Sequence, residues 1–210
     1  MSAVAGTGAD RSPYLGDSLS INTDLLVARF NSSDVLLASN ISFSGLALSG
    51  VDSENYILQN HSSTTNSILP KTVGLSADRI YDGTRNLTGA DISIVTGVGA
   101  ESLSYSGATV NSKDVAVTGK YIDTITLEDA LDGSGGLASN YHLPSLDSSD
   151  APVVISPKTV SLSASKIYDA GLDLTGYVSI VTGVGAETLS YSGATSSSKD
   201  VAVSGKYIDA

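Results

Sequence analysis

The chain has 210 residues, a net charge of −11 and no cysteine. The negative charge argues against binding to nucleic acid or anionic lipid, because both need a basic face. The lack of cysteine excludes disulfides, zinc–thiolate sites and cysteine nucleophiles, and no apolar run approaches the length of a membrane span.

An internal repeat dominates the sequence. KTVGLSADRIYDG, which starts at Lys71, returns as KTVSLSASKIYDA at Lys158, and SIVTGVGAESLSYSGAT returns as SIVTGVGAETLSYSGAT. The displacement is 87 residues at the front (Tyr81 to Tyr168) and 86 after a one-residue deletion near Gly176. A period this long predicts a whole small domain and not one coil of a β-helix.

Taken in chain order, the sequence contains three copies of this segment. Residues 1–12 are small and polar and are expected to form a loop or an edge. Apolar alternation begins after Asp17, and NSSDVLLASNIS from Asn31 aligns with NSKDVAVTGKYI from Asn111. Proline favours the start or edge of a strand, so we place the seams at Pro70 and Pro157. The first copy (1–70) then lacks its front, the second copy (71–157) is complete, and the third copy (158–210) lacks its back.

Within the second copy, apolar residues alternate with period two, which predicts half-buried strands. The alternating runs contain Val73, Leu75 and Ala77; Ile92, Ile94 and Val98; Leu103 and Tyr105; Val115 and Val117; and Tyr121, Ile125 and Leu127. YDG (Tyr81–Gly83) and TGVG (Thr96–Gly99) are expected as turns, since Asp and Gly accept positive φ. A helical signal at 127–138 is weakened by three glycines.

These patterns predict an all-β chain of tandem small modules of about 87 residues, arranged as a rod. Both a β-sandwich-like and a β-grasp-like module fit short alternating strands. A third copy without its last strands would leave an unpaired sheet edge. We therefore expect either a module whose bounds are out of phase with the seams, or pairing of that edge with the first copy or with another chain.

Acidic loops are the only candidates for metal ligands. The calcium candidates are Asp129, Asp132, Asp147 and Asp150. An EF-hand-like loop needs more carboxylates at alternate positions and a closing Glu, so turn capping by Asp side chains is the favoured interpretation. No cofactor is expected apart from this calcium alternative.

Other constellations are better explained by the fold than by chemistry. His61 and His142 do not recur in phase, so a catalytic triad built on them would be a coincidence, and no catalytic residue is expected. Recurrent tyrosines more often pack in the core and bond at a corner than line a glycan-binding face. An isopeptide bond between Lys71 or Lys158 and Asn140 is an alternative that a mass deficit of one ammonia would reveal.

The order K-x-V, K-x-YDG, SGAT, DV-x-V-x-G, NY-x-L and I-x-PK resembles the YDG-type repeats of large bacterial surface adhesins, the filamentous-haemagglutinin-like, two-partner-secreted exoproteins. The departures are Ala170, where the motif has glycine, and an insert at 129–136. The repeat-motif residues are Lys71, Tyr81, Asp82, Gly83, Asp114, Tyr121, Asn140, Tyr141, Lys158, Tyr168, Asp169, Asp200 and Tyr207, together with Val115, Pro157 and Val201.

The resemblance implies a secreted or surface-anchored structural stalk that supports attachment or biofilm formation, and it implies no catalysis. No secretion signal opens the sequence, so an exported protein would carry this segment inside a longer chain. The expected partners are neighbouring repeats and host or matrix glycans or proteins, with no nucleic acid and no membrane insertion. A carbohydrate-binding module is the rival interpretation.

Overall fold

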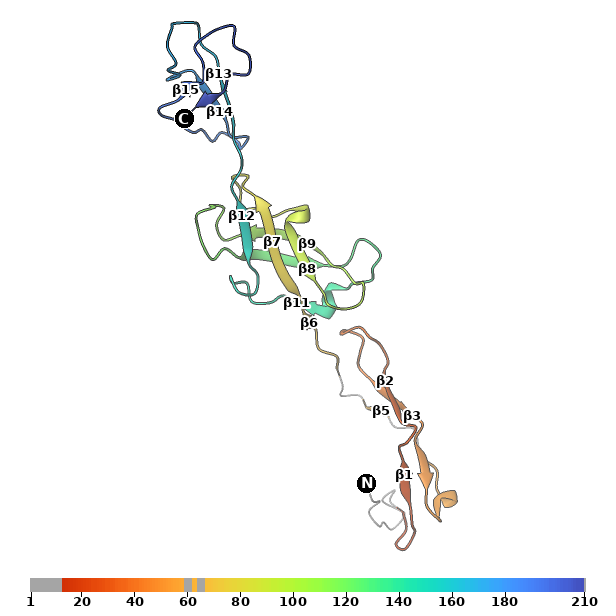
Figure 1. Ribbon diagram of the computed structural model, residues 1–210. Helices are drawn as coiled ribbons and strands as arrows, with labels where there is room; N and C mark the ends of the chain where they lie inside the picture. The colour runs from red at the N-terminus through yellow and green to blue at the C-terminus, as the bar shows by residue number, and fades with distance from the viewer. Residues whose placement is uncertain (1–12, 59–61, 64–66, 210) are drawn as a thin grey trace. The chain divides into compact units, whose positions relative to one another are not determined.

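The computed structural model describes residues 13–58, 62–63 and 67–209. These residues form sixteen β-strands and three one-turn 3-10 helices (Figure 1), so the all-β prediction is confirmed. Residues 1–12, expected as a loop or an edge, and His61 lie outside the described residues. The chain divides into two compact units, Met1–Thr72 with Gly135–His142, and Val73–Ser134 with Leu143–Ala210.

The first unit consists of narrow sheets with little core. Its elements are β1 (Ser20–Asn22), β2 (Val27–Phe30), β3 (Ile41–Ser44), β4 (Ala47–Ser49), η1 (Ser53–Asn55), β5 (Ser62–Ser63), β6 (Lys71–Thr72), η3 (Ala138–Asn140) and β11 (Tyr141–His142). The sheet orders are β1–β4, β2–β3–β5 and β11–β6. Among its described residues only Ala38 and Tyr141 are buried apolar side chains, so little hydrophobic burial stabilises this unit.

The second unit carries the main sheets. Its elements are β7 (Gly74–Ile80), η2 (Gly89–Asp91), β8 (Ile92–Val95), β9 (Ser104–Val110), β10 (Ile122–Glu128), β12 (Val153–Ser156), β13 (Ser161–Ala164), β14 (Val178–Val181), β15 (Thr195–Ser196) and β16 (Ile208–Asp209). β7 is central in a three-stranded sheet, antiparallel to β8 and parallel to β12. β9 and β10 form an antiparallel pair.

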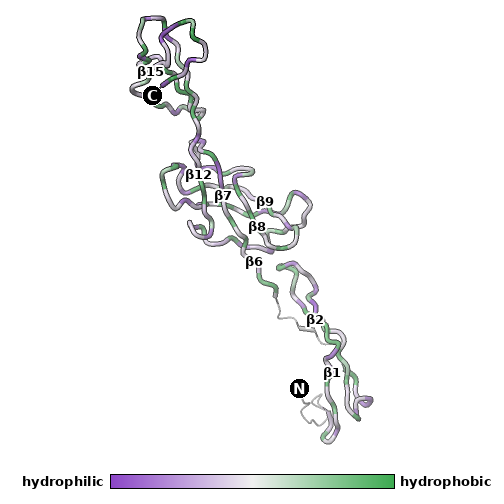
Figure 2. The backbone as a smooth tube through the Cα atoms, in the orientation of Figure 1, coloured by the Kyte–Doolittle hydropathy of each residue, from purple (hydrophilic) through white to green (hydrophobic). Residues whose placement is uncertain are grey.

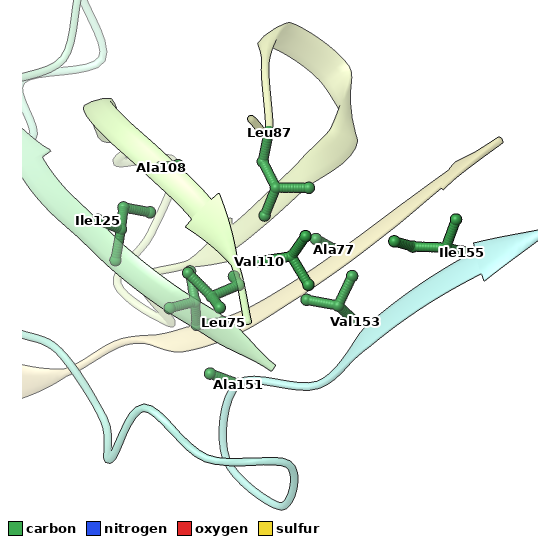
Figure 3. Close-up of a cluster of buried hydrophobic side chains, with 10 residues drawn as sticks. Leu75, Ala77, Leu87, Ala108, Val110, Ile125, Ala151, Val153 and Ile155 are labelled. Atoms are coloured by element: carbon green, nitrogen blue, oxygen red, sulfur yellow. The ribbon is translucent and has the colours of Figure 1, made fainter. Parts of the chain in front are cut away.

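One hydrophobic core lies between these sheets in the second copy (Figure 3). β7 points alternate side chains inward, so Leu75 and Ala77 are buried while their neighbours are exposed. Val110 and Ile122 are fully buried on the β9–β10 pair. Apolar and polar segments interleave closely along the chain (Figure 2), as expected for strands with one buried face.

The strand predicted around Val115 and Val117 is wrong, because this segment forms a turn. The buried side chain of Lys120 explains it: its Nζ donates to the carbonyls of Asp114 (3.3 Å), Val115 (3.0 Å) and Val117. The ammonium group accepts no bonds and donates to all three carbonyls, so these carbonyls must point to the same place. In an extended strand successive carbonyls point in opposite directions, and they could not meet at one ammonium group.

The helix signal at 127–138 is also overruled. β10 continues to Glu128, and glycines at 133 and 135 adopt positive φ in the loop that follows. A single 3-10 turn, η3, begins only at Ala138.

In the third copy, β13 and β14 reproduce the pairing of β7 and β8. Ser161 pairs with Val181 as Gly74 pairs with Val95, which is the same register after the repeat displacement. The two hairpins differ in what covers their outer edge, since β12 pairs with β7 and no described strand pairs with β13 on that side.

Candidate functional site

The YDG turn of the second copy lies against a turn of the third copy, and this contact is the candidate functional site. β7 ends at Ile80. The next backbone N–H, that of Tyr81, donates to the carbonyl of Ser156 at the end of β12 (2.9 Å). The turn therefore starts from a fixed point on the sheet.

A buried arginine and a carboxylate shape the YDG turn. Arg79, the last inward residue of β7, pairs with Asp82 and donates to the carbonyls of Asn86 and Thr84 (3.3 Å to Thr84). Asp82 in turn accepts bonds from the backbone N–H (2.8 Å) and hydroxyl (3.0 Å) of Thr84. Gly83 adopts φ +82°, which a glycine accepts without strain.

The facing surface is a turn that follows β14. The hydroxyl of Thr182 accepts from the Val184 N–H (3.2 Å) and donates to the Glu187 carbonyl (3.0 Å), and the Glu187 N–H donates to the Val184 carbonyl (3.0 Å). The turn after β8 carries the same three bonds among Thr96, Val98 and Glu101. We call the two segments, 96–101 and 182–187, the valine turns.

Two side-chain contacts and one close backbone approach join the two surfaces. The hydroxyl of Tyr81 donates to Glu187 Oε1 at 2.5 Å, and Lys113 Nζ lies 3.8 Å from the same oxygen. A Cβ placed on Gly83 would be only 2.6 Å from Val184 Cγ1, so the backbone of Gly83 packs directly on that valine. We call this set, Tyr81, Gly83, Lys113, Val184 and Glu187, the joint.

Burial of the valine marks the contact. Val184 is 6% exposed, whereas its counterpart Val98, at the same place in the other valine turn, is 38% exposed. The bond to the Glu187 carboxylate raises the pKa of Tyr81, with burial and the same negative charge adding to the effect. The joint therefore favours a neutral, donating tyrosine.

The third copy has the same motif without such a neighbour among the described residues. Lys166 replaces Arg79 and lies 2.8 Å from Asp169, which lowers the pKa of that carboxyl. Ala170 takes φ +64° and is the only non-glycine with positive φ in the described part of the chain. The glycine of the motif stands at position 171 in the third copy, one place after the counterpart of Gly83. The left-handed conformation nevertheless stays at position 170, which is that counterpart.

The remaining motif residues are not brought together at the joint. Asn140 accepts from the Val35 N–H (2.8 Å) and donates to Asp34 (3.2 Å) in the first unit. Lys71 pairs in register with Tyr141, and Lys158 lies beside Gly183. Asp114 and Asp200 begin equivalent turns through their carbonyls, and Tyr121 and Tyr207 donate backbone N–H groups to Asn111 and Ser197.

The calcium candidates are engaged in turns. Asp132 accepts from the Ser102 hydroxyl (2.7 Å) and the Ser134 N–H (2.9 Å), which lowers the pKa of its carboxyl to about 2. Asp147 accepts from Ser149 and from the Asp150 N–H. No group of three or more His, Cys, Asp or Glu side chains that could hold a metal occurs within residues 13–58, 62–63 and 67–209. Calcium binding by Asp129 or its neighbours stays a prediction.

Tyrosine hydroxyls mark corners of the fold. Tyr105 donates to the Gly89 carbonyl (3.0 Å), and burial raises its pKa. Tyr191 donates to the Leu174 carbonyl (2.9 Å) and accepts from the Val178 N–H (3.1 Å). Tyr56 donates to Asp17, which raises its pKa.

Sequence reasoning missed four residues of the joint and its support: Arg79, Lys113, Val184 and Glu187. The position of Arg79 is visible as the basic residue two places before the Tyr-Asp pair, and Lys166 holds it in the third copy. Glu187 recurs in phase with Glu101, but no pattern in the sequence links it to a tyrosine about a hundred residues away. The turn expected at Thr96–Gly99 from its glycines is confirmed.

The joint contains no nucleophile paired with a base and offers shape, one charge-assisted hydrogen bond and apolar contact. Such a set suits recognition of one protein segment by another. No helix in the described residues combines the length and apolar character that crossing a membrane requires. No protein-family model matches the chain, and neither the curated proteins nor the solved structures yield a match.

Proposed function

We propose that the chain is a set of structural stalk or spacer repeats from a secreted or surface-attached bacterial adhesin, and that it extends and presents other parts of that protein for attachment or biofilm formation. The observation that carries the proposal is the joint, in which the YDG turn of one sequence copy packs on the valine turn of the next copy. A motif that recurs with the repeat and binds the following repeat is what a tandem array needs.

The modules of this array have about 87 residues and follow one another as a rod. The parallel pairing of β7 with β12, the first long strand and the last strand of the second copy, favours a β-grasp-like module over an antiparallel sandwich. The acidic, cysteine-free composition supports a chain whose folding does not depend on redox state.

Small-angle scattering tests the rod. A compact 210-residue domain would have a radius of gyration of about 17 Å, and an unfolded chain about 50 Å. The proposal predicts a value clearly above the first and below the second, with a distance distribution that has a long tail. A radius of gyration near the compact value would refute the arrangement.

A display assay tests the role. The chain is placed on a bacterial surface beneath a binding domain of known specificity and, in a control, without that domain. A spacer increases capture of ligand-coated beads through a dense surface layer and adds no capture when the binding domain is absent.

The rival from another class is a carbohydrate-binding module. Exposed tyrosines in the third copy, Tyr168 and Tyr207, are the residues that would stack on sugars. Binding of the intact chain to defined glycans, abolished by replacing these tyrosines with alanine, would favour this rival. The spacer proposal expects no glycan binding.

A further inference from the structure

The first long strand of the second copy and its last strand lie side by side and run in the same direction. β7 and β12 are paired in parallel, from Ala77 with Val153 to Ile80 with Ser156 (Figure 1). In the sequence the first copy precedes β7 and the third copy follows β12. The strands that connect the second copy to its two neighbours are therefore bonded directly to each other.

This pairing determines how tension along the chain acts on the second copy. Tension from the preceding copy pulls β7 at its amino end, and tension from the following copy pulls β12 at its carboxyl end. In a parallel pair these two points lie at opposite ends, so the force slides one strand along the other and loads all the bonds between them together. In an antiparallel pair of successive strands, such as β9 and β10, the two outer ends lie together, and pulling them apart would break the bonds one after another.

Two backbone hydrogen bonds mark the ends of the paired stretch. The Ala77 N–H donates to the Pro152 carbonyl (3.0 Å) where the pairing begins. The Tyr81 N–H donates to the Ser156 carbonyl (2.9 Å) where it ends. β12 is therefore bonded to β7 over its whole length, and a sliding force meets no loose end from which to peel it.

The other side of β12 is bonded to the segment that starts β10. The Val153 N–H donates to the Lys120 carbonyl, and the Ile122 N–H donates to the Ala151 carbonyl, both at 3.0 Å. Because Ala151 and Ile122 are completely buried, water does not compete for the bond between them. Bonds on both sides thus keep β12 in place while a load acts on it.

The packing of side chains opposes sliding as well. Val153 and Ile155 are buried in the core of the second copy, while Val154 between them is 55% exposed. A slip by one residue would turn the two buried side chains to the opposite face of the strand. The strand must therefore move by two residues, about 7 Å, before its side chains fit the core again.

We propose that the second copy is a force-bearing module, in which the β7–β12 pair is a mechanical clamp that resists tension along the chain. Its backbone bonds share the load, and the buried side chains of Val153 and Ile155 fix its register. The clamp goes beyond the spacer role and does not depend on it, because it is a property of the fold of this copy.

Single-molecule force spectroscopy on the full chain tests the clamp by pulling one fold in two directions. Because the chain has no cysteine, introduced cysteine pairs define the points of attachment. Leu69→Cys with Thr159→Cys pulls β7 and β12 along each other, whereas Leu69→Cys with Asp150→Cys pulls their amino ends apart; all three positions are exposed. Unfolding in the first direction is recognised by the release of chain between residues 69 and 159, which measures about 30 nm when fully extended. The sliding direction should need at least about twice the force of the peeling direction at the same loading rate, because its bonds break together.

A change of one backbone group separates the clamp from the rest of the fold. Because the Val153 N–H points to Lys120, the alternation along the strand directs the Val154 N–H to β7. Val154→Pro removes this donor and should abolish most of the difference in force between the two directions. Val154→Ala, which shortens the same exposed side chain and keeps the N–H, should preserve the difference.

Two results would overturn the proposal. The first is an unfolding force in the sliding direction that is equal to or lower than the force in the peeling direction. This comparison needs no change within the strand pair, so a folding defect cannot imitate it. The second is a Val154→Pro chain that keeps the parent's force in the sliding direction, in a sample whose amide exchange shows that β7 and β8 are paired.

Discussion

Replacing Gly83 with alanine should separate the second and third copies at the joint. Two effects add at this position. The residue has φ +82°, and left-handed backbone costs an alanine about 1–2 kcal/mol. The new methyl would also lie 2.6 Å from Val184 Cγ1, a distance that forces the two surfaces apart.

A second glycine with a similar φ distinguishes the backbone strain of the substitution from the separation of the two copies. Gly133 has φ +78°, and no atom lies within 4 Å of the place that a methyl group would take there, so Gly133→Ala carries the backbone cost without a clash. Re-exposing Val184 removes about 1.5 kcal/mol of burial, which shifts the equilibrium between closed and open joint by roughly tenfold. Only Gly83→Ala should produce this shift.

The absence of cysteine makes a distance measurement straightforward. Spin labels on S93C in the second copy and S190C in the third copy, both at exposed positions, report the distance between the copies. The parent chain and Gly133→Ala should give the same narrow distribution, and Gly83→Ala a broad one. A narrow distribution in Gly83→Ala would refute the packing argument, as would equal broadening in both variants.

Three further predictions concern the strain at Ala170, the core at Ile122 and the titration of Tyr81. Ala170→Gly should raise the stability of the third copy by about 1 kcal/mol in thermal unfolding, because it removes left-handed strain, and a loss of similar size would contradict this. Ile122→Ala should cost about 2–5 kcal/mol, and Ile208→Ala at the equivalent position less than half of that, since only Ile122 is fully buried; amide exchange in each copy separates the two. The bond to Glu187 raises the pKa of Tyr81 above 10.0. The stabilisation of the joint by this bond is therefore complete below pH 10, and it is lost as the pH rises through the pKa that Tyr81 has in the folded chain. The joint should therefore open above pH 10, and Tyr81→Phe should remove this part of the pH dependence.

Local patterns in the sequence were enough to find β7, β8 and β10, but they missed β12, whose Val153 and Ile155 are buried in the same core. Period-two alternation at Val73, Leu75 and Ala77 reflects one buried face, and the structure buries these side chains. The same alternation at Val115 and Val117 was misleading. There, Lys120 draws the backbone carbonyls into a turn, and a lysine in a sequence carries no sign that its ammonium group will be used in this way.

The joint could be predicted only in part. The repeat identifies the positions of Tyr81, Asp82 and Gly83 as part of the motif. The positive φ of the backbone at position 83 explains why a glycine is found there. The repeat cannot tell that the glycine also makes room for Val184, because that contact joins segments about a hundred residues apart. A left-handed backbone and room for a neighbouring valine are two separate requirements at this position. Ala170 meets the first of them, at a cost in strain.

The most direct test of the docking of one copy on the next is a nuclear Overhauser measurement between Gly83 and Val184. Because a Cβ built on Gly83 would lie 2.6 Å from Val184 Cγ1, the α protons of Gly83 and a methyl group of Val184 should give a strong cross-peak in the intact chain. The cross-peak should weaken as the pH rises above 10, where Tyr81 loses its bond to Glu187. Its absence at neutral pH, in a spectrum that contains the expected cross-peaks between β7 and β8 and between β13 and β14, would contradict the account.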